Sequence, residues 1–141
     1  MKPVVLLDTG PLVAFLHASD HHHAWSREQF NQLEAPLLTC EAVIAESCHL
    51  LRKLPNAQGC VLQMIERGSM RIDFSLQQES TAIAELLQRY RDRPASLADM
   101  CLVRMSEIHN SSIVLTLDSD FHVYRRLGRK TISLLHPKLN N

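Results

Sequence analysis

Two short apolar runs, each ending at an acid, constrain the fold of this chain more than any other feature. PVVLL (residues 3–7) leads directly into Asp8, and SIVLTL (residues 112–117) leads into Asp118. Nearly continuous apolar runs of this length are typical of strands buried on both faces of a parallel sheet, because a strand with one solvated face alternates apolar and polar residues. The sequence therefore predicts two buried parallel strands, each ending at a carboxylate.

Helical segments and further short apolar runs separate these two strands. Helices are predicted to begin near Pro11 and to cover residues 21–35, 41–54, 56–68, 75–92, 94–110 and 120–128, and further strands are predicted at 36–40, 70–74 and 131–135. Alternation of strands and helices with short connections favours an α/β fold, with a central parallel sheet covered by helices on both faces. A length of 141 residues suits one domain spanning residues 1–141.

The sequence carries no pattern typical of a membrane or secreted protein. No apolar run approaches the roughly 20 residues that span a bilayer, and the opening MKPVVLLDTG reaches an acid too early for a signal peptide. The four cysteines form no C-x-x-C pair. We therefore expect a cytoplasmic protein with no membrane partner.

The acids that end the two buried strands occupy positions where open parallel sheets bind ligands. Such ligands lie outside the carboxyl ends of the strands, which is where Asp8 and Asp118 are predicted. Thr116 is two residues before Asp118, so both side chains should lie on one face of the strand, and the hydroxyl is expected to steady the Asp118 carboxylate. The alternative is that either acid only caps a helix or closes a turn.

Two further acids lie in helical segments with apolar neighbours. Glu46 has apolar residues on its own helical face, and Asp99 is followed by the four apolar residues MCLV. A buried carboxylate is costly unless it is paired or binds a metal, and neither acid has an obvious Lys or Arg on its face. A cation bound between them would remove this cost. Oxygen ligands of this kind suit Mg²⁺ or Mn²⁺.

Glu41 and Asp120 lie close to these acids in the sequence, and a structural role is open to each. Glu41 is five residues before Glu46, which rotates it by about 140° around a helix, so only one of the two can face a site. We expect Glu41 to interact with the dipole at the helix start. For Asp120, the sequence leaves open whether it caps the helix that begins near Phe121 or supports the acidic site.

Four segments resemble the signature blocks of PIN domains, in the order in which that family has them: LLDTGPLVAFL, LLTCEAVIAESCHLL, LADMCLVRMSE and VLTLDSDFHVYR. Within the family, the chain is most similar to the VapC-like toxins of bacterial toxin–antitoxin pairs. The resemblance implies an acidic catalytic quartet of Asp8, Glu46, Asp99 and Asp118, with Asp8, Asp99 and Asp118 as metal ligands. It also implies supporting roles for Thr9, Thr116 and Asp120.

The same resemblance implies an activity and partners. PIN domains of this kind are Mg²⁺- or Mn²⁺-dependent ribonucleases, and VapC-like members commonly form homodimers and are inhibited by an antitoxin protein. Phosphodiester hydrolysis requires an activated water and neutralisation of phosphate charge, which metal ions held by carboxylates can supply. The alternative is a PIN-like module that binds RNA or a protein without cutting. Loss of RNA cleavage on chelation would separate the two.

Positive charge is concentrated at the end of the chain. All 15 acids lie in the first 120 residues, against 10 of the 15 Lys and Arg residues, and no acid follows Asp120. The basic residues that we expect to contact the RNA backbone are Arg125, Arg126, Arg129 and Lys130. The alternative is that this run is only a solvated surface.

Overall fold

The structure of the chain is a computed structural model that describes residues 2–138. Its strands are β1 (Val4–Leu7), β2 (Leu37–Thr39), β3 (Met70–Ile72), β4 (Ser112–Leu115), β5 (Arg125–Arg126), β6 (Lys130–Thr131) and β7 (Leu134–Leu135). Its helices are α1 (Thr9–Leu16), α2 (His23–Gln32), α3 (Glu41–Leu50), α4 (Ala57–Glu66), α5 (Leu76–Arg89), α6 (Leu97–Ile108) and the short 3₁₀ helix η1 (Ser119–His122).

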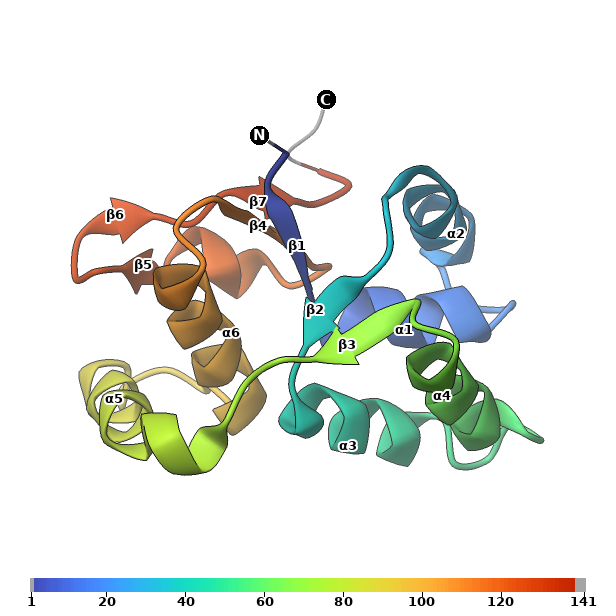
Figure 1. Cartoon of the computed structure of the whole chain (residues 1–141), viewed down its shortest axis with the longest axis horizontal. Coiled ribbons are helices and arrows are strands. Elements are labelled where there is room, and N and C mark those ends of the chain that lie inside the picture. The colour runs from blue at the N-terminus through green and yellow to red at the C-terminus, as the bar shows by residue number, and fades with distance from the viewer. Residues whose placement is uncertain (1, 139–141) are drawn as a thin grey trace.

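Five strands form the predicted parallel sheet, in the order β3-β2-β1-β4-β7. The two apolar runs lie side by side at its centre, with Val5 opposite Ile113 and Leu7 opposite Leu115. The chain continues from β1 to β2 and β3 on one side, and later places β4 and β7 on the other (Figure 1). The carboxyl ends of β1 and β4 therefore form the point of topological reversal where ligands of such sheets bind.

Helices cover both faces of the sheet, as predicted. Leu6 of β1 packs into one apolar cluster with residues of α5 and α6, while Val5 and Leu7 point to the other face and pack with residues of α1 and α4. Figure 1 shows α5 and α6 on one side of the strands and α1, α2 and α4 on the other. Alternate residues of one strand thus bury both faces, which explains why PVVLL carries no polar alternation.

The predicted helix over residues 120–128 is wrong beyond His122. The chain instead forms an antiparallel hairpin in which Arg125 pairs with Thr131. Leu127 and Gly128 have φ angles of +52° and +81°, a left-handed conformation that reverses the chain tightly between the two strands. The predicted strand at 131–135 is accordingly divided between β6 and β7.

Two buried aromatic residues lie in the segment where the helix was predicted. Phe121 and Tyr124 are both fully buried and are three residues apart, a spacing that also fits one face of a helix. In the structure, the first belongs to η1 and the second lies between η1 and β5. Burial of both aromatic residues therefore does not require a continuous helix.

Elsewhere the predicted elements are present with shifted ends. The first helix begins at Thr9, two residues before Pro11, because Asp8 caps it; the missing N–H of Pro11 still falls in the first turn, where it has no partner to lose. α3 ends at Leu50 rather than at residue 54. Within residues 2–138, no helix is both long enough and apolar enough to cross a membrane.

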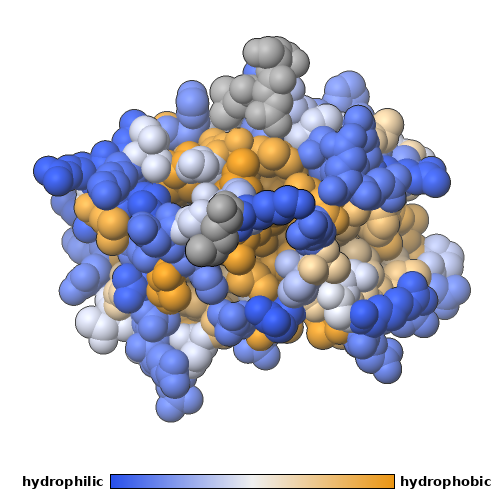
Figure 2. All heavy atoms as spheres, turned by 45° about the horizontal axis from the view of Figure 1, so that its top comes forward, coloured by the Kyte–Doolittle hydropathy of each residue, from blue (hydrophilic) through white to orange (hydrophobic). Residues whose placement is uncertain are grey.

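Apolar side chains also gather at the end of the molecule where β1 begins. Figure 2 looks onto this end and shows them in the centre of the view. A hollow of about 460 Å³ lies here, with Val4, Ile113 and Leu135 in its lining. This end of the sheet is opposite the carboxyl ends of β1 and β4, so it is separate from the acids described next.

Candidate active site

The four acids singled out in the sequence line one cleft at the carboxyl end of the sheet. The cleft has a volume of about 390 Å³, and its lining consists of Asp8, Thr9, Gly10, Glu46, Leu50, Pro94, Ser96, Asp99, Leu117 and Asp118. Two other hollows, on the outer side of α2 and at the opposite end of the sheet, are slightly larger at about 460 Å³ each, but each has a single acid in its lining. The chemistry of the side chains, not the size of the hollow, therefore identifies the candidate site.

Asp8 is the most buried of the four acids, with 5% of its surface exposed. It directly follows β1 and caps α1: Oδ1 accepts a hydrogen bond from the Thr9 backbone N–H (2.8 Å), and Oδ2 accepts one from the Thr116 hydroxyl (2.7 Å). The pKa of Asp8 is raised to about 7, chiefly by burial and in smaller part by the negative charges of Asp99 and Asp118, against the opposing effect of the two hydrogen bonds. The two hydrogen bonds thus hold Asp8 in place, but they do not fully offset the effect of burial on its pKa.

Glu46 lies on α3, the helix that follows β2, and its side chain reaches the same cleft. Its Oε1 accepts a hydrogen bond of 2.6 Å from the hydroxyl of Thr9, the residue that follows Asp8. The expectation that Glu46 is buried is wrong, because its side chain is exposed at the mouth of the cleft. Glu41 begins α3, where its charge favours the helix dipole, and it is not part of the cleft lining.

Asp99 lies in the first turn of α6 and is half-buried. Ser96 and Asp99 form a capping box: the Ser96 hydroxyl accepts from the Asp99 N–H (3.0 Å), and Asp99 Oδ2 accepts from the Ser96 N–H (3.4 Å). The Tyr124 hydroxyl also donates to Oδ2, over 3.0 Å. Burial raises the pKa of Asp99, and the charge of Asp118 adds to this, while its hydrogen bonds oppose it.

Asp118 follows β4 by three residues and caps η1, with its Oδ1 accepting from the Asp120 N–H (2.9 Å). The prediction that the Thr116 hydroxyl steadies the Asp118 carboxylate is wrong. That hydroxyl donates to Asp8 and accepts from the Asp118 backbone N–H (2.9 Å). β4 ends at Leu115, so the strand alternation used for the prediction does not extend to these two residues.

Asp120 does not cap η1, because Asp118 occupies the capping position. Its Oδ1 instead accepts a hydrogen bond from Arg93, with 3.2 Å between Oδ1 and the guanidinium nitrogen. Arg93 directly precedes Pro94, which lines the cleft. The sequence left open whether Asp120 caps the helix or supports the acidic site. The structure excludes the capping role and places Asp120 in an ion pair beside the acidic cleft.

The carboxylates differ in how many oxygens the chain itself occupies. Both oxygens of Asp8 accept hydrogen bonds, whereas within residues 2–138 Glu46, Asp99 and Asp118 each keep one oxygen without a protein donor. In the same part of the chain, no three His, Cys, Asp or Glu side chains are grouped as the ligands of a single ion. The site is therefore an acidic cleft with available oxygens, not a closed cage of ligands.

The donor set fits a hard divalent cation that keeps part of its hydration shell. Mg²⁺ loses water reluctantly and is commonly held by one or two carboxylates, so it does not require a closed cage. Mutual repulsion among Asp8, Asp99 and Asp118 contributes to the raised pKa of Asp8, and a cation among them would relieve that repulsion. The chemistry of the oxygens and the unfavourable charge both suit such an ion.

The basic residues predicted to contact RNA lie on the hairpin, in two different situations. The guanidinium of Arg125 donates to the backbone carbonyls of residues 122–124, and that of Arg126 donates to the Ser106 carbonyl (2.9 Å) and to Asn110. Arg129 and Lys130 are exposed, and within residues 2–138 their side chains have no hydrogen-bond partner. The hairpin therefore presents two of the four predicted residues to solvent, while the guanidinium groups of the other two are hydrogen-bonded to backbone carbonyls.

Comparison with known proteins bears on the resemblance noted in the sequence. A family model of the PIN domain matches residues 5–127. This chain belongs to the PIN domain family. The ribonuclease VapC26 of Mycobacterium tuberculosis is 25% identical over 127 residues, which cover 88% of this chain and 94% of VapC26.

A solved structure supports the same fold. The crystal structure of VapC20 from Mycobacterium tuberculosis, described as a toxin that cleaves the sarcin–ricin loop, superimposes with a TM-score of 0.76. The match covers 84% of this chain and 93% of VapC20, at 17% sequence identity. At that identity the likeness shows the fold of this PIN domain. The resemblance to VapC-like PIN domains is confirmed.

Sequence reasoning missed three residues that contact the acids. Ser96 could have been found, since S-x-x-D before an apolar run is a capping-box pattern. Arg93 and Tyr124 carried no such signal. Their contacts to Asp120 and Asp99 join residues that are 27 and 25 positions apart in the sequence.

Proposed function

We propose that this protein is a metal-dependent endoribonuclease that uses Mg²⁺ or Mn²⁺ to hydrolyse phosphodiester bonds of RNA, with residues 1–141 acting as one nuclease domain. The observation that carries the proposal is the meeting of four acids from four different elements in a single cleft. Four carboxylates gathered at the carboxyl ends of two central strands destabilise the fold, so a purely structural role does not account for them. Membership of the PIN domain family supports the same reaction class.

We assign a separate role in hydrolysis to each group of residues in the cleft. Asp8, Asp99 and Asp118 would hold the cation, which when bound lowers the pKa of water and neutralises phosphate charge. Glu46 is exposed at the cleft mouth, and Thr9 holds its Oε1, which leaves Oε2 to accept a proton from the attacking water. Thr9 and Thr116 orient the carboxylates, and Asp120 supports the segment that begins at Asp118.

We further propose that RNA reaches the cleft along the basic hairpin. Arg129 and Lys130 are exposed there and carry the charge for contacts with phosphates. Arg125 and Arg126 would add positive potential, although their guanidinium groups are already hydrogen-bonded to backbone carbonyls. The formal net charge of the chain is zero, so attraction to RNA must come from such a local cluster.

The biological role that we propose is that of a VapC-type toxin in the cytoplasm, neutralised by a cognate antitoxin protein and acting as a homodimer. Similarity to VapC26 over 88% of this chain supports that role. The expected genetic arrangement is a small neighbouring gene whose product co-purifies with this protein. Light scattering of the purified chain tests the homodimer directly.

The decisive experiment follows cleavage of a labelled single-stranded RNA by the purified protein. We expect cleavage with millimolar Mn²⁺ or Mg²⁺, none with EDTA, and a loss of at least about 100-fold in Asp99→Asn. Asp92→Asn is the matched control, because Asp92 is exposed and not part of the cleft lining. Retained RNA binding with no metal-dependent cleavage would instead favour the non-catalytic binding module.

A further inference from the structure

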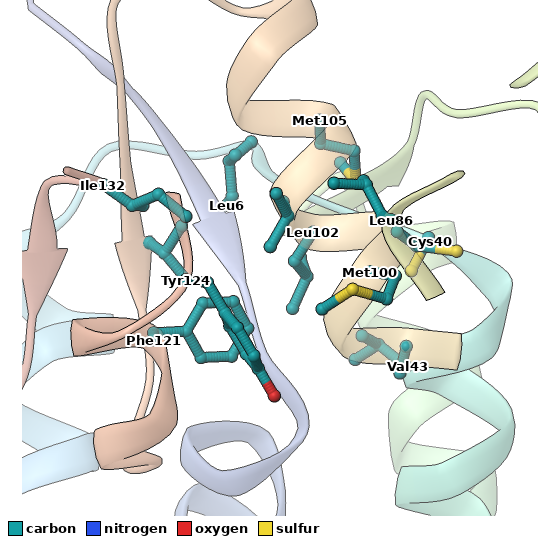
Figure 3. Close-up of a cluster of buried hydrophobic side chains, with 14 of the residues drawn as sticks. Leu6, Cys40, Val43, Leu86, Met100, Leu102, Met105, Phe121, Tyr124 and Ile132 are labelled. Carbon is teal, nitrogen blue, oxygen red and sulfur yellow. The ribbon is translucent and has the colours of Figure 1, made fainter. Parts of the chain in front are cut away.

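The hydroxyl of Tyr124 is the one phenol that contacts an acid of the cleft in the described part of the chain. It donates to Asp99 Oδ2 over 3.0 Å. The Tyr124 side chain is fully buried, and Figure 3 shows its ring inside the apolar cluster beside Phe121, with the hydroxyl at the end directed away from Ile132. A fully buried ring that ends in a polar contact is positioned by its surroundings and has little freedom to move.

Aromatic neighbours fix the direction of that hydroxyl. The ring of Tyr124 makes edge contacts with Phe121 and Tyr90, with 5.2 Å and 5.0 Å between ring centroids. Its backbone N–H donates to the Asp120 carbonyl over 3.1 Å, within the segment that Asp118 caps. The hydroxyl therefore links the segment that carries Asp118 to α6.

This contact determines which oxygen of Asp99 the chain occupies. Oδ2 accepts from the Tyr124 hydroxyl and from the more distant Ser96 N–H, at 3.4 Å. Oδ1 has no hydrogen-bond donor within residues 2–138. A carboxylate held through one oxygen presents the other in a fixed orientation, which is how partners behind a ligand usually raise its affinity for a metal.

We propose that Tyr124 is a positioning residue that holds Asp99 Oδ2 and so directs Oδ1 toward a divalent cation in the cleft. The inference rests on the proposed metal-dependent function and assigns to it a residue outside the acidic set. Tyr124 acts through Asp99 and does not touch the cation or RNA. It also sets the position of α6 relative to the segment that begins at Asp118, because it contacts both.

The test compares Tyr124→Phe with Tyr90→Phe, using Mn²⁺ alone as the ligand. The control removes a phenol from the same aromatic cluster, but one that accepts from the Arg125 backbone N–H (2.8 Å) and contacts no acid. The readout is the midpoint of the Mn²⁺-induced rise in Tm. We expect Tyr124→Phe to weaken Mn²⁺ binding by about tenfold and Tyr90→Phe to leave it unchanged. Equal midpoints in the two variants would overturn the inference, even if both lower the Tm of the metal-free protein.

A double variant tests whether Tyr124 works through Asp99. If it does, adding Tyr124→Phe to Asp99→Asn weakens Mn²⁺ binding no further. A further tenfold loss would contradict the proposed route. In cleavage assays, Tyr124→Phe should need about ten times more Mn²⁺ for half-maximal rate and should recover most of its kcat at saturating metal. A purely structural role would not shift the metal requirement in this way.

A second measurement leaves the hydroxyl in place. The chain has only two tyrosines, so 3-fluorotyrosine incorporated into Tyr90→Phe labels Tyr124 alone. Its ¹⁹F resonance should shift on titration with Mg²⁺, with the same midpoint as the rise in Tm. A resonance that stays constant while Mg²⁺ raises the Tm would overturn the inference and leave the proposed function intact. Absence of any Mn²⁺ or Mg²⁺ effect on the unmutated protein would refute the proposed function itself.

Discussion

The buried carboxyl group of Asp8 should make the metal-free protein less stable as pH rises from about 4 to about 7. The pKa of Asp8 is about 7 in the folded chain, against an ordinary value of 3.8. Between these values the folded state keeps a proton that the unfolded state has lost, so the free energy of unfolding falls as pH rises. The difference between about 7 and 3.8 corresponds to roughly 4 kcal/mol of lost stability above pH 7. The raised pKa of Asp99 acts in the same direction.

A divalent cation should oppose this loss, and increasingly so at higher pH. The proton and the cation compete for the same carboxylates, so the cation binds best when Asp8 is ionised. An ion at 100 times its dissociation constant stabilises the folded state by about 2.7 kcal/mol, because it binds only that state. For a chain of this length, that stabilisation corresponds to a rise in Tm of roughly 8–10 °C.

The assay is thermal unfolding followed by circular dichroism between pH 5 and pH 8, with EDTA or with millimolar Mn²⁺. Asp8→Asn should flatten the pH dependence and remove most of the Mn²⁺ effect. Asn retains an oxygen for the Thr9 N–H and is as good a helix cap as Asp, so the fold should survive. Asp92→Asn, which alters an exposed acid, should behave like the unmutated protein. An unchanged pH slope in Asp8→Asn, or a Mn²⁺ effect that does not vary with pH, would refute the reasoning.

Three further predictions concern Asp118 with Asp120, the basic hairpin, and the N-terminal cap of α6. Asp118→Asn should abolish RNA cleavage at saturating Mn²⁺, while Asp120→Asn should only reduce kcat; the reverse order would mean that the metal ligand is assigned to the wrong residue. Replacing Arg129 and Lys130 with Ala should weaken binding to unrelated single-stranded RNAs and reduce the salt slope by about 0.7 for each lost phosphate contact, with the Mn²⁺ effect on Tm unchanged. A constant salt slope would show that the hairpin does not bind RNA. Ser96→Ala should cost about 1 kcal/mol in urea unfolding, because the capping box of α6 is lost, and unchanged stability would argue against that cap.

The sheet and the set of acids could be predicted because both depend on local patterns. PVVLL and SIVLTL indicate buried parallel strands, and an acid that follows such a strand must lie at its carboxyl end. Glu46 and Asp99 were recognisable from apolar neighbours, although Glu46 proved to be exposed. The hairpin at 125–131 was not predictable in the same way, because its left-handed turn includes Leu127, a residue type that rarely adopts φ of +52°.

The partners of the acids could not be predicted, because they come from distant parts of the chain. The Thr116 hydroxyl that holds Asp8 is 108 residues away in the sequence, and the Thr9 hydroxyl that holds Glu46 is 37 residues away. Such contacts depend on which strands are adjacent and on where each strand ends. β4 ends one residue before Thr116, and that single boundary turns its hydroxyl toward Asp8 instead of Asp118.

A structural role and a role in the cleft do not exclude each other for these acids, because the first supports the second. Asp118 caps η1 through Oδ1, and Asp99 completes a capping box through Oδ2. In each case the cap occupies one oxygen and thereby orients the carboxylate, and the second oxygen stays without a protein donor within residues 2–138. Asp8 differs, since α1 and Thr116 occupy both of its oxygens, and it is also the acid with the highest cost of burial. Asp8 can bind a cation only through the remaining lone pairs of those two oxygens. Because its burial is the most costly, we expect Asp8 to contribute more than any other acid in the cleft to the metal-dependent rise in the free energy of unfolding.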